Sequence, residues 1–346
     1  MTHDTICTGA KLTAIADAIR AKGNTEGAMT LDEMPGAVAS LPTGSGGGVA
    51  ALVARTLTSI PEADTITAIG EYAFSRCTQL AGEVVLPNAT VIWHSSFDRC
   101  AGVTALVAPK CTRLYSLGDM TGLERLELPM VDLFMDNLRT PKLRLLCLPE
   151  CTDFRGQLSG GTYNCATLER IRLPKATTMP TDGSNSPLAN NVATLTSVSL
   201  EALTNAHGYT YGNPAYLLNK CVALTSVYLP SVSTLGGCVF CDCTSLTSLW
   251  LPSCTQIIGT SIGKGTPIDT LVLPGETMCR LSGSLNSNVP IAQGTGYVYV
   301  PDSLVDDYKA ASGWSTYAAQ IRAIEDYPDV VAAARATAES AAQGWS

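Results

Sequence analysis

The sequence is poor in histidine and in basic residues, and both shortages exclude functions. Only His3, His94 and His207 occur, and none lies in a Ser/His/Asp or Cys/His arrangement, an HExxH helix or a nucleophile elbow. Lys and Arg number 22 against 30 Asp and Glu, which gives a net charge of −8. Nucleic-acid binding depends mainly on basic side chains at phosphates. We therefore expect a protein that is not an enzyme, uses no cofactor and binds no nucleic acid.

Long apolar runs are missing as well. No stretch approaches the length of a transmembrane helix, and the residues after Met1 form neither the basic nor the apolar region of a secretory signal. We therefore expect no membrane insertion and no signal peptide. A protein without a secretory signal that acts outside the cell would have to leave the cell by a route other than secretion. Assembly into a virion in the host cytoplasm, followed by lysis, is such a route.

A leucine-proline step recurs along most of the chain and predicts a solenoid. It closes a phrase that in most copies reads Leu-x-x-(Leu/Val/Ile)-x-Leu-Pro, as in Leu123–Pro129 and Leu246–Pro252. The copies lie 20 to 29 residues apart and end at Pro87, Pro109, Pro129, Pro149, Pro174, Pro230, Pro252 and Pro274, with weaker copies at Glu201 and Pro301. One such unit cannot bury its own apolar face and must stack on its neighbours.

Each repeat predicts a strand, a tight turn and a return segment. Apolar residues two apart before the proline, such as Leu249 and Leu251, indicate a strand with one buried face. The proline ends the strand because it has no N–H to donate. A small residue and a Thr, Ser or Asp follow, and a short helical or irregular return completes the coil. We predict an α/β solenoid of about ten coils over residues 56–301, with a parallel sheet on one face.

Most of the 13 cysteines fall into columns of the repeat. Ala and Val replace the cysteines of one column in other copies, which is typical of small buried residues rather than of disulfides or metal ligands. Zinc needs about four converging ligands, and the closely spaced Cys238, Cys241 and Cys243 have no second pair at matching spacing, so we predict no metal site. The column positions are Cys77, Cys100, Cys165, Cys221 and Cys243, and then Cys111, Cys151 and Cys254.

Residues 1–43 predict a small helical module. Its apolar residues follow helical spacing, with a capping-box pattern at Thr30 and Glu33. A helix pair of this size buries too little apolar surface to be stable alone. We expect it to anchor the chain or to drive homo-oligomerisation, while capping of the first coil is the alternative. The Gly-rich residues 44–55 would link it to the repeats. The residues that carry this prediction are Leu12, Ile15, Ile19, Leu31, Met34, Val38 and Leu41.

Residues 302–346 predict a helical cap and a tail. Two short helical stretches lie on either side of Trp314, and a solenoid needs a cap over its last coil. The Ala-rich stretch 329–342 is helix-prone. The sequence leaves open whether this stretch is a docking helix or a frayed tail.

One residue of each predicted strand, between the last two apolar positions, points out of the sheet. Towards the end of the array these residues are Tyr228, Trp250 and Tyr299. Since adjacent strands lie about 4.8 Å apart, we predict an aromatic strip that solvent can reach. Exposed rings flanked by hydroxyls suit a sugar or a protein partner, while packing that only stabilises the sheet is the alternative. The flanking residues are Thr225, Thr247 and Ser248.

Two parts of the sequence resemble known families. The phrases Ile69–Pro87 and Leu235–Pro252 resemble the BspA-like class of bacterial and phage leucine-rich repeats. Residues Leu12–Leu41 resemble an N-terminal module of phage tail-associated proteins. Together the resemblances imply a non-enzymatic virion protein that contacts other virion proteins through its N-terminal helices and a host-surface glycan or protein through its solenoid. The alternatives are a decoration protein whose solenoid is a rigid spacer, and a bacterial BspA-like surface adhesin.

Overall fold

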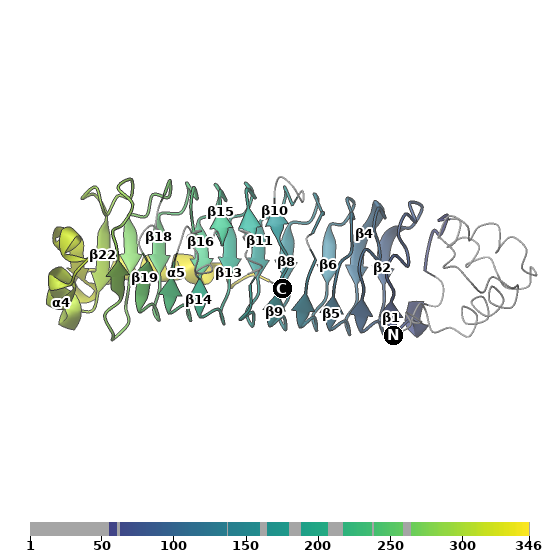
Figure 1. Cartoon of the computed structure of the whole chain (residues 1–346), viewed down its shortest axis with the longest axis horizontal. Helices are drawn as coiled ribbons and strands as arrows, with labels where there is room; N and C mark the ends of the chain where they lie inside the picture. The colour runs from purple at the N-terminus through teal and green to yellow at the C-terminus, as the bar shows by residue number, and fades with distance from the viewer. Residues whose placement is uncertain are drawn as a thin grey trace, which may run out of the picture. The chain divides into compact units, whose positions relative to one another are not determined.

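The computed structural model describes residues 55–60, 63–136, 138–159, 165–179, 188–206, 217–236, 239–258 and 264–345. The predicted N-terminal module and all of the predicted linker except its last residue lie outside these ranges. The chain divides into two compact units: unit 1 ends at Leu143 and unit 2 begins at Arg144. Each is a parallel β-solenoid, and together they contain about ten turns (Figure 1).

In unit 1 the leucine-proline phrases form the predicted strands. The register aligns Val84 with Leu106 and Leu106 with Leu126, and all three side chains are buried. Their neighbours on either side point out of the sheet, as the alternation of strand side chains requires. The paired strands are β2 (Ala81–Val85), β4 (Gly102–Val107) and β6 (Arg125–Glu127).

A second series of short parallel strands corrects the prediction of a sheet on one face. In unit 1 it comprises β1 (Ala68–Ile69), β3 (Val91–Ile92), β5 (Arg113–Leu114) and β7 (Leu133–Phe134). Strands β3, β5 and β7 each come after the turn at a proline. The second residue of every strand in this series is apolar and buried in the coil, which holds the strand against the core. Hydroxyl groups also tie the coils here: Thr90 Oγ1 donates to Thr67 O at 3.0 Å and Thr112 Oγ1 to Thr90 O at 3.2 Å.

The return segments pack through phenylalanine and cysteine side chains that recur from one coil to the next. Phe74 and Phe97 stack with ring centroids 5.2 Å apart, and the Cys100 thiol donates to Phe74 O at 3.0 Å. All eight cysteines assigned to columns are buried, so their predicted packing role is confirmed. Burial raises the pKa of the Cys100 and Cys243 thiols to about 12, which keeps them protonated and poorly nucleophilic at neutral pH.

Unit 2 repeats the leucine-proline face. Its first sheet contains β8 (Leu145–Cys147), β11 (Arg170–Arg172), β13 (Ser197–Ser199) and β16 (Ser226–Tyr228). Its second contains β18 (Ser248–Trp250), β20 (Thr270–Val272), β22 (Tyr297–Val300) and β23 (Ile321–Ala323).

Other short strands line the remaining sides of the unit 2 coils. One parallel series contains β14 (Asn205–Ala206), β17 (Thr234–Leu235), β19 (Gln256–Ile258) and β21 (Arg280–Ser282). Another contains β10 (Leu158–Ser159), β12 (Ala189–Asn190) and β15 (Leu218–Asn219). The coils described in this unit are therefore built from strands and turns, and its helices follow the last coil.

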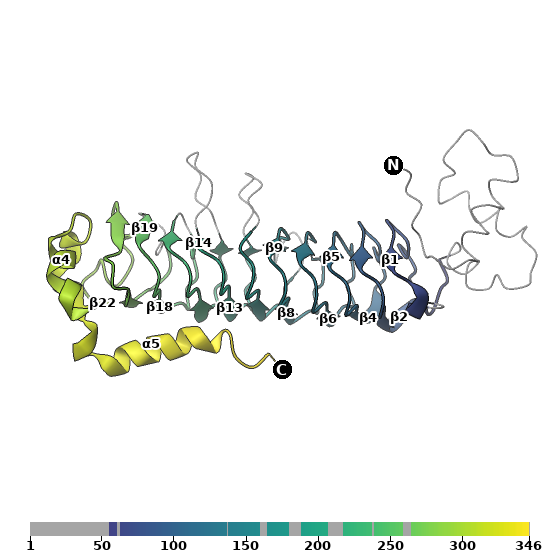
Figure 2. The same ribbon diagram turned by 90° about the horizontal axis from the view of Figure 1, so that it is seen from below.

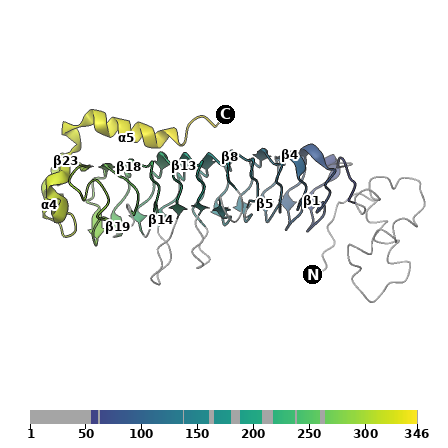
Figure 3. The ribbon, with the colours of Figure 1, turned by 90° about the horizontal axis from the view of Figure 1, so that it is seen from above.

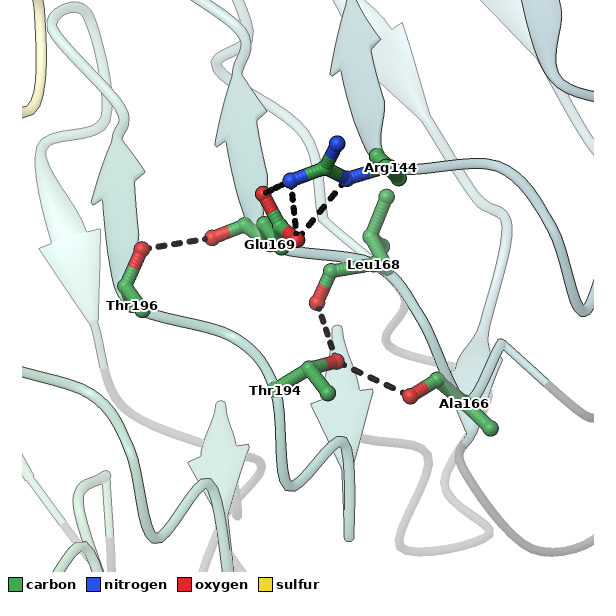
Figure 4. A network of polar contacts seen from close by, with 6 residues as sticks. All are labelled: Arg144, Ala166, Leu168, Glu169, Thr194 and Thr196. Atoms are coloured by element: carbon green, nitrogen blue, oxygen red, sulfur yellow. Dashed lines mark hydrogen bonds and ion pairs between the residues drawn. The ribbon is translucent and has the colours of Figure 1, made fainter.

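Polar side chains also join neighbouring coils of unit 2 (Figure 4). Arg144 donates from Nε and Nη2 to the two carboxylate oxygens of Glu169, both at 2.8 Å. Thr194 Oγ1 lies 2.9 Å from Ala166 O and 2.8 Å from Leu168 O. Thr196 Oγ1 donates to Glu169 O at 3.0 Å. Since each bond links one coil to the next, the contacts hold the stacking register.

Aromatic side chains cap the last coil, as the sequence around Trp314 predicts. Trp314 is fully buried and donates from Nε1 to Cys279 O at 2.6 Å. The Tyr308 hydroxyl accepts from Cys279 N at 2.7 Å. The backbone of the last coil thus finds partners that a further coil would otherwise supply. The cap contains η3 (Asp302–Leu304), α4 (Val305–Ala310) and η4 (Ser315–Gln320).

After the cap come η5 (Ile324–Asp326) and α5 (Pro328–Ser340). Figures 2 and 3 both show α5 turned back along the leucine-proline face of unit 2, beside the strands rather than beyond the last coil. The Ala-rich stretch is therefore a docking helix rather than a frayed tail. Within the described ranges, every helix is too short or too polar to cross a membrane.

Candidate recognition surfaces

Unit 2 brings the three predicted aromatic residues onto one face. Trp250 pairs in register with Val272, and Val272 with Tyr299. The rings of Tyr228 and Trp250 stack at 6.2 Å between centroids and 6° between planes. We call Tyr228, Trp250 and Tyr299 the aromatic strip. Its ligand-binding role stays a prediction.

Helix α5 covers this strip, so the prediction of solvent access is wrong for Tyr299. Tyr299 is only 5% exposed and forms a small core with Val272 and Ala334 of α5. Trp250 packs against that core and is half-buried, as is Tyr228. Burial raises the pKa of the Tyr228 and Tyr299 hydroxyls. The strand pattern fixed the direction of these rings, but a segment from beyond the array lies over them.

Of the hydroxyls predicted beside the strip, one bonds to the neighbouring coil and the other two lie at an exposed and a half-buried position. Thr225 Oγ1 donates to Thr196 O at 3.3 Å, a bond between coils. Thr247 is exposed and Ser248 is half-buried. The hydroxyl that contacts α5 belongs to Ser226 of β16, which also stands beside the strip. It is hydrogen-bonded to Thr337 O and lies 3.1 Å from Ser340 Oγ.

Charged groups fasten the helix and the residues after it. The Arg335 guanidinium lies 5.6 Å from the ring centroid of Trp250, and Arg335 Nε donates to Glu339 at 2.7 Å. Further along, Arg170 of β11 donates to Gly344 O at 3.0 Å and lies 4.3 Å from the Trp345 ring centroid. The C-terminal segment therefore has contacts on β18, β16 and β11.

Unit 1 carries an aromatic cluster that the sequence reasoning missed. Trp93 and Tyr115 directly follow β3 and β5, and their rings stack at 4.5 Å with only 5° between planes. The His94 ring lies 5.3 Å from that of Tyr115, and Tyr72 N donates to His94 O at 3.1 Å. Trp93 is 36% exposed and Tyr72 is 48% exposed. We call Tyr72, Trp93, His94 and Tyr115 the unit 1 aromatic cluster.

A signal for this cluster was present in the repeat. Each post-proline phrase ends in an apolar residue, Ile92 or Leu114, and the very next residue is Trp93 or Tyr115. The leucine-proline phrase alone does not reveal these outward positions, because they adjoin the second strand series. Aligning both phrases would have placed the two rings on successive coils.

A buried carboxyl group supports the segment that follows Tyr115. Asp136 is 1% exposed, and it accepts hydrogen bonds from Leu117 N at 2.7 Å and from Ser116 Oγ at 3.2 Å. Burial raises the pKa of the Asp136 carboxyl to about 7. These bonds fix the backbone next to Tyr115, whose side chain is half-buried. Asp136 is therefore a positioning residue for the cluster.

Within the ranges that the structure describes, His, Cys, Asp and Glu side chains do not gather in threes in a way that could hold a metal ion. Cys238, which belongs to the closely spaced cysteines 238–243 of the sequence, lies outside those ranges.

Comparison with known proteins supports the type of repeat. A family model described as a BspA type leucine-rich repeat region, in six copies, matches residues 51–121 and 214–283. These two stretches contain the phrases that resemble BspA-like repeats, so that resemblance is confirmed there. The resemblance of residues 12–41 to a phage module stays a prediction. Among curated proteins, none matches the chain.

The chain is also similar to several solved structures. A leucine-rich repeat protein from Bacteroides ovatus ATCC 8483 is 17% identical over 78% of this chain and 85% of its own, with a TM-score of 0.36. A leucine-rich cell surface protein from Faecalibacterium prausnitzii A2-165 is 17% identical over 77% and 79%, with a TM-score of 0.24. An internalin from Listeria monocytogenes is 15% identical over 72% and 75%, with a TM-score of 0.30.

Proposed function

We propose that this chain is a non-enzymatic recognition protein of the adhesion type. It displays its leucine-rich repeat coils and binds a host-surface glycan or protein through exposed side chains on them. The observation that carries the proposal is the unit 1 aromatic cluster, in which two stacked rings reach solvent on rigid coils. Ring faces bind the apolar faces of sugars and the side chains of protein partners, and aromatic residues are enriched where partners bind.

The geometry of the cluster suits a shallow site. The rings of Trp93 and Tyr115 lie parallel and stack face to face, so they offer a partner one continuous aromatic stack rather than two separate contacts. His94, whose ring lies 5.3 Å from that of Tyr115, adds hydrogen-bonding groups at its margin. Asp136 holds the following segment in place, which lowers the cost of ordering the stacked rings on binding.

Substitution of the two stacked rings, Trp93 and Tyr115, tests the proposal. The variant Trp93→Ala/Tyr115→Ala should lose at least about tenfold in affinity for cells, as expected when aromatic anchors are removed. Binding of labelled protein is measured on a panel of Gram-positive and gut bacteria. Met130→Ala is the matched control, because Met130 is an exposed apolar residue of the same unit. Undiminished binding by the double variant, with its fold intact, would contradict the proposal.

The finer proposal places this surface on a phage virion, on the tail. Its support is the resemblance of residues 12–41 to a module of tail-associated proteins. In this proposal Leu12, Ile15, Ile19, Leu31, Met34, Val38 and Leu41 contact other virion proteins or a second copy of the chain. Ile15→Glu/Ile19→Glu should then give a monomer in analytical ultracentrifugation while cell binding per chain is kept. An unchanged assembly state would contradict an oligomerising role.

A bacterial surface adhesin is the second candidate. The match to BspA type repeats supports it as well as it supports the virion protein. Mass spectrometry distinguishes the two, because a virion protein is found in purified particles at a fixed ratio to the other structural proteins. A purely structural spacer, the third candidate, would bind no cell in the assay above.

A further inference from the structure

We propose that residues 328–345, helix α5 with the segment that follows it, form a reversible strap over the strand face of unit 2. When the strap leaves, the buried ring of Tyr299 and the half-buried rings of Tyr228 and Trp250 become exposed to solvent. This inference concerns unit 2 alone. It does not depend on the unit 1 aromatic cluster or on the ligand proposed for it.

The strap buries the strip with small side chains. Its fully buried residues are Ala334, Ala338 and Ala341, while the larger Val330 and Val331 are only half-buried. A buried methyl group contributes far less hydrophobic free energy than the leucine and phenylalanine side chains inside the coils. The helix side of this contact therefore contributes less hydrophobic free energy than the side chains that hold the coils together.

Polar contacts fix the position of the strap. Ser226 is buried and bonds to the carbonyl of Thr337, and Arg335 lies over Trp250. At the far end Arg170 donates to Gly344 O and packs on Trp345. Water can hydrogen-bond to all these groups once the strap leaves. Opening therefore leaves none of them unpaired in an apolar interior.

The helix itself depends on docking. α5 is 13 residues long, a length at which an isolated helix is marginal in water even for Ala-rich sequences. Leaving the strand face therefore also melts the helix. Such opening is local, because the strap comes after β23 and the cap, and every coil of unit 2 is complete without it.

Hydrogen exchange of the full-length protein measures this opening. We expect the amides of α5 to exchange at least about tenfold faster than those of β18 and β20, as local opening requires. Exchange of α5 at the same rate as these strands would overturn the proposal, because the helix would then open only when the unit unfolds.

A matched pair of variants tests whether the strap shields Tyr299 and Trp250 from solvent. Ala334 is buried against Tyr299, while its neighbour Ala333 is exposed. Ala334→Glu places an unpaired charge at the contact and should lower docking about 100-fold, whereas Ala333→Glu makes the same chemical change on the open side. Hydroxyl-radical footprinting, read by mass spectrometry, then reports the accessibility of Tyr299 and Trp250.

In Ala334→Glu, oxidation of Tyr299 and Trp250 should rise about tenfold while β18 and β20 stay protected from exchange. Ala333→Glu should match the natural protein. Two results would each overturn the proposal. One is protection of Tyr299 that persists in Ala334→Glu. The other is loss of strand protection in that variant, which would make the strap an integral part of the unit.

Discussion

The same position of the repeat is exposed to solvent in unit 1 and buried in unit 2. Val85 in unit 1 and Tyr299 in unit 2 both precede the last apolar residue of a leucine-proline strand and both point out of the sheet. Val85 is 43% exposed, whereas Tyr299 is 5% exposed beneath α5. The repeat determines which way a side chain points, but a segment from outside the repeat determines whether water reaches it. An aromatic column on such a fold is therefore no proof of an open site.

The largest expected effect tests whether the units share one type of core. Phe97 in unit 1 and Phe240 in unit 2 hold the same repeat position, and both are fully buried. Replacing either by Ala should lower the free energy of unfolding of its unit by about 3–5 kcal/mol, the usual cost of such a cavity. Urea denaturation followed by segment-resolved hydrogen exchange measures it. Met130→Ala, on the surface, should change little, and a large gap between the two Phe variants would mean that the cores differ.

Next in size is a pH dependence expected of unit 1. Burial raises the pKa of Asp136 from 3.8 to about 7, so the folded unit binds a proton that the unfolded chain has already released. The stability from this group is fully present below about pH 4 and is lost as pH rises through about 7. Between pH 5 and pH 8 the loss should be about 2–3 kcal/mol.

Asp136→Asn should remove this slope, because the amide does not titrate and its oxygen still accepts from Leu117 N. Urea midpoints measured across that pH range give the slope, with Glu71→Gln, at an exposed position, as the control. A slope that persists in Asp136→Asn would assign the pH dependence to other groups. Nearby Arg139 and Asp119 also bear on the carboxyl, the first lowering and the second raising its pKa.

A smaller difference is expected between the two tryptophans. Trp250→Ala should cost unit 2 about 1–3 kcal/mol, since its ring packs between Tyr228 and the strap. Trp93→Ala should cost unit 1 at most about 1 kcal/mol, the value of an exposed ring stack. Thermal unfolding of the two variants compares them. Equal costs would argue against the strap as the source of the difference.

The smallest effects belong to surface ion pairs. Arg125 in unit 1 pairs with Glu83 and Glu127, and Arg144 in unit 2 pairs with Glu169. All these side chains are a third or more exposed, so Arg125→Gln and Arg144→Gln should each cost less than about 1 kcal/mol. The cost should shrink further at high salt. A larger, salt-insensitive loss would show that these arginines act by packing.

The sequence predicts the parts of this fold that recur and misses those that do not. Leu249 and Leu251 reveal their strand by spacing alone, and the cysteine columns reveal packing because Ala and Val replace cysteine in other copies. The second strand series was missed because strands of two residues show no alternation. The same gap hid Trp93 and Tyr115, which can be recognised only once both phrases are aligned.

The docking of α5 could not be predicted for a different reason. A helix faced with alanine has only a weak contrast between its buried and exposed sides, so Ala334 and Ala333 look alike in the sequence. Their different burial depends on contacts with Val272 and Tyr299, which lie far away along the chain. Long-range contacts of this kind leave no local pattern.

The hydroxyl bonds between coils have an evolutionary consequence. The hydroxyl of Thr112 donates to the backbone carbonyl of Thr90, and the hydroxyl of Thr90 donates to that of Thr67. The same pair of groups therefore joins each coil to the next. Duplication or loss of one whole repeat in the gene leaves every such bond intact, whereas a partial insertion breaks the series. The length of the array is therefore free to change in whole-coil steps of about 4.8 Å. Natural variants of this protein should differ in reach by those steps.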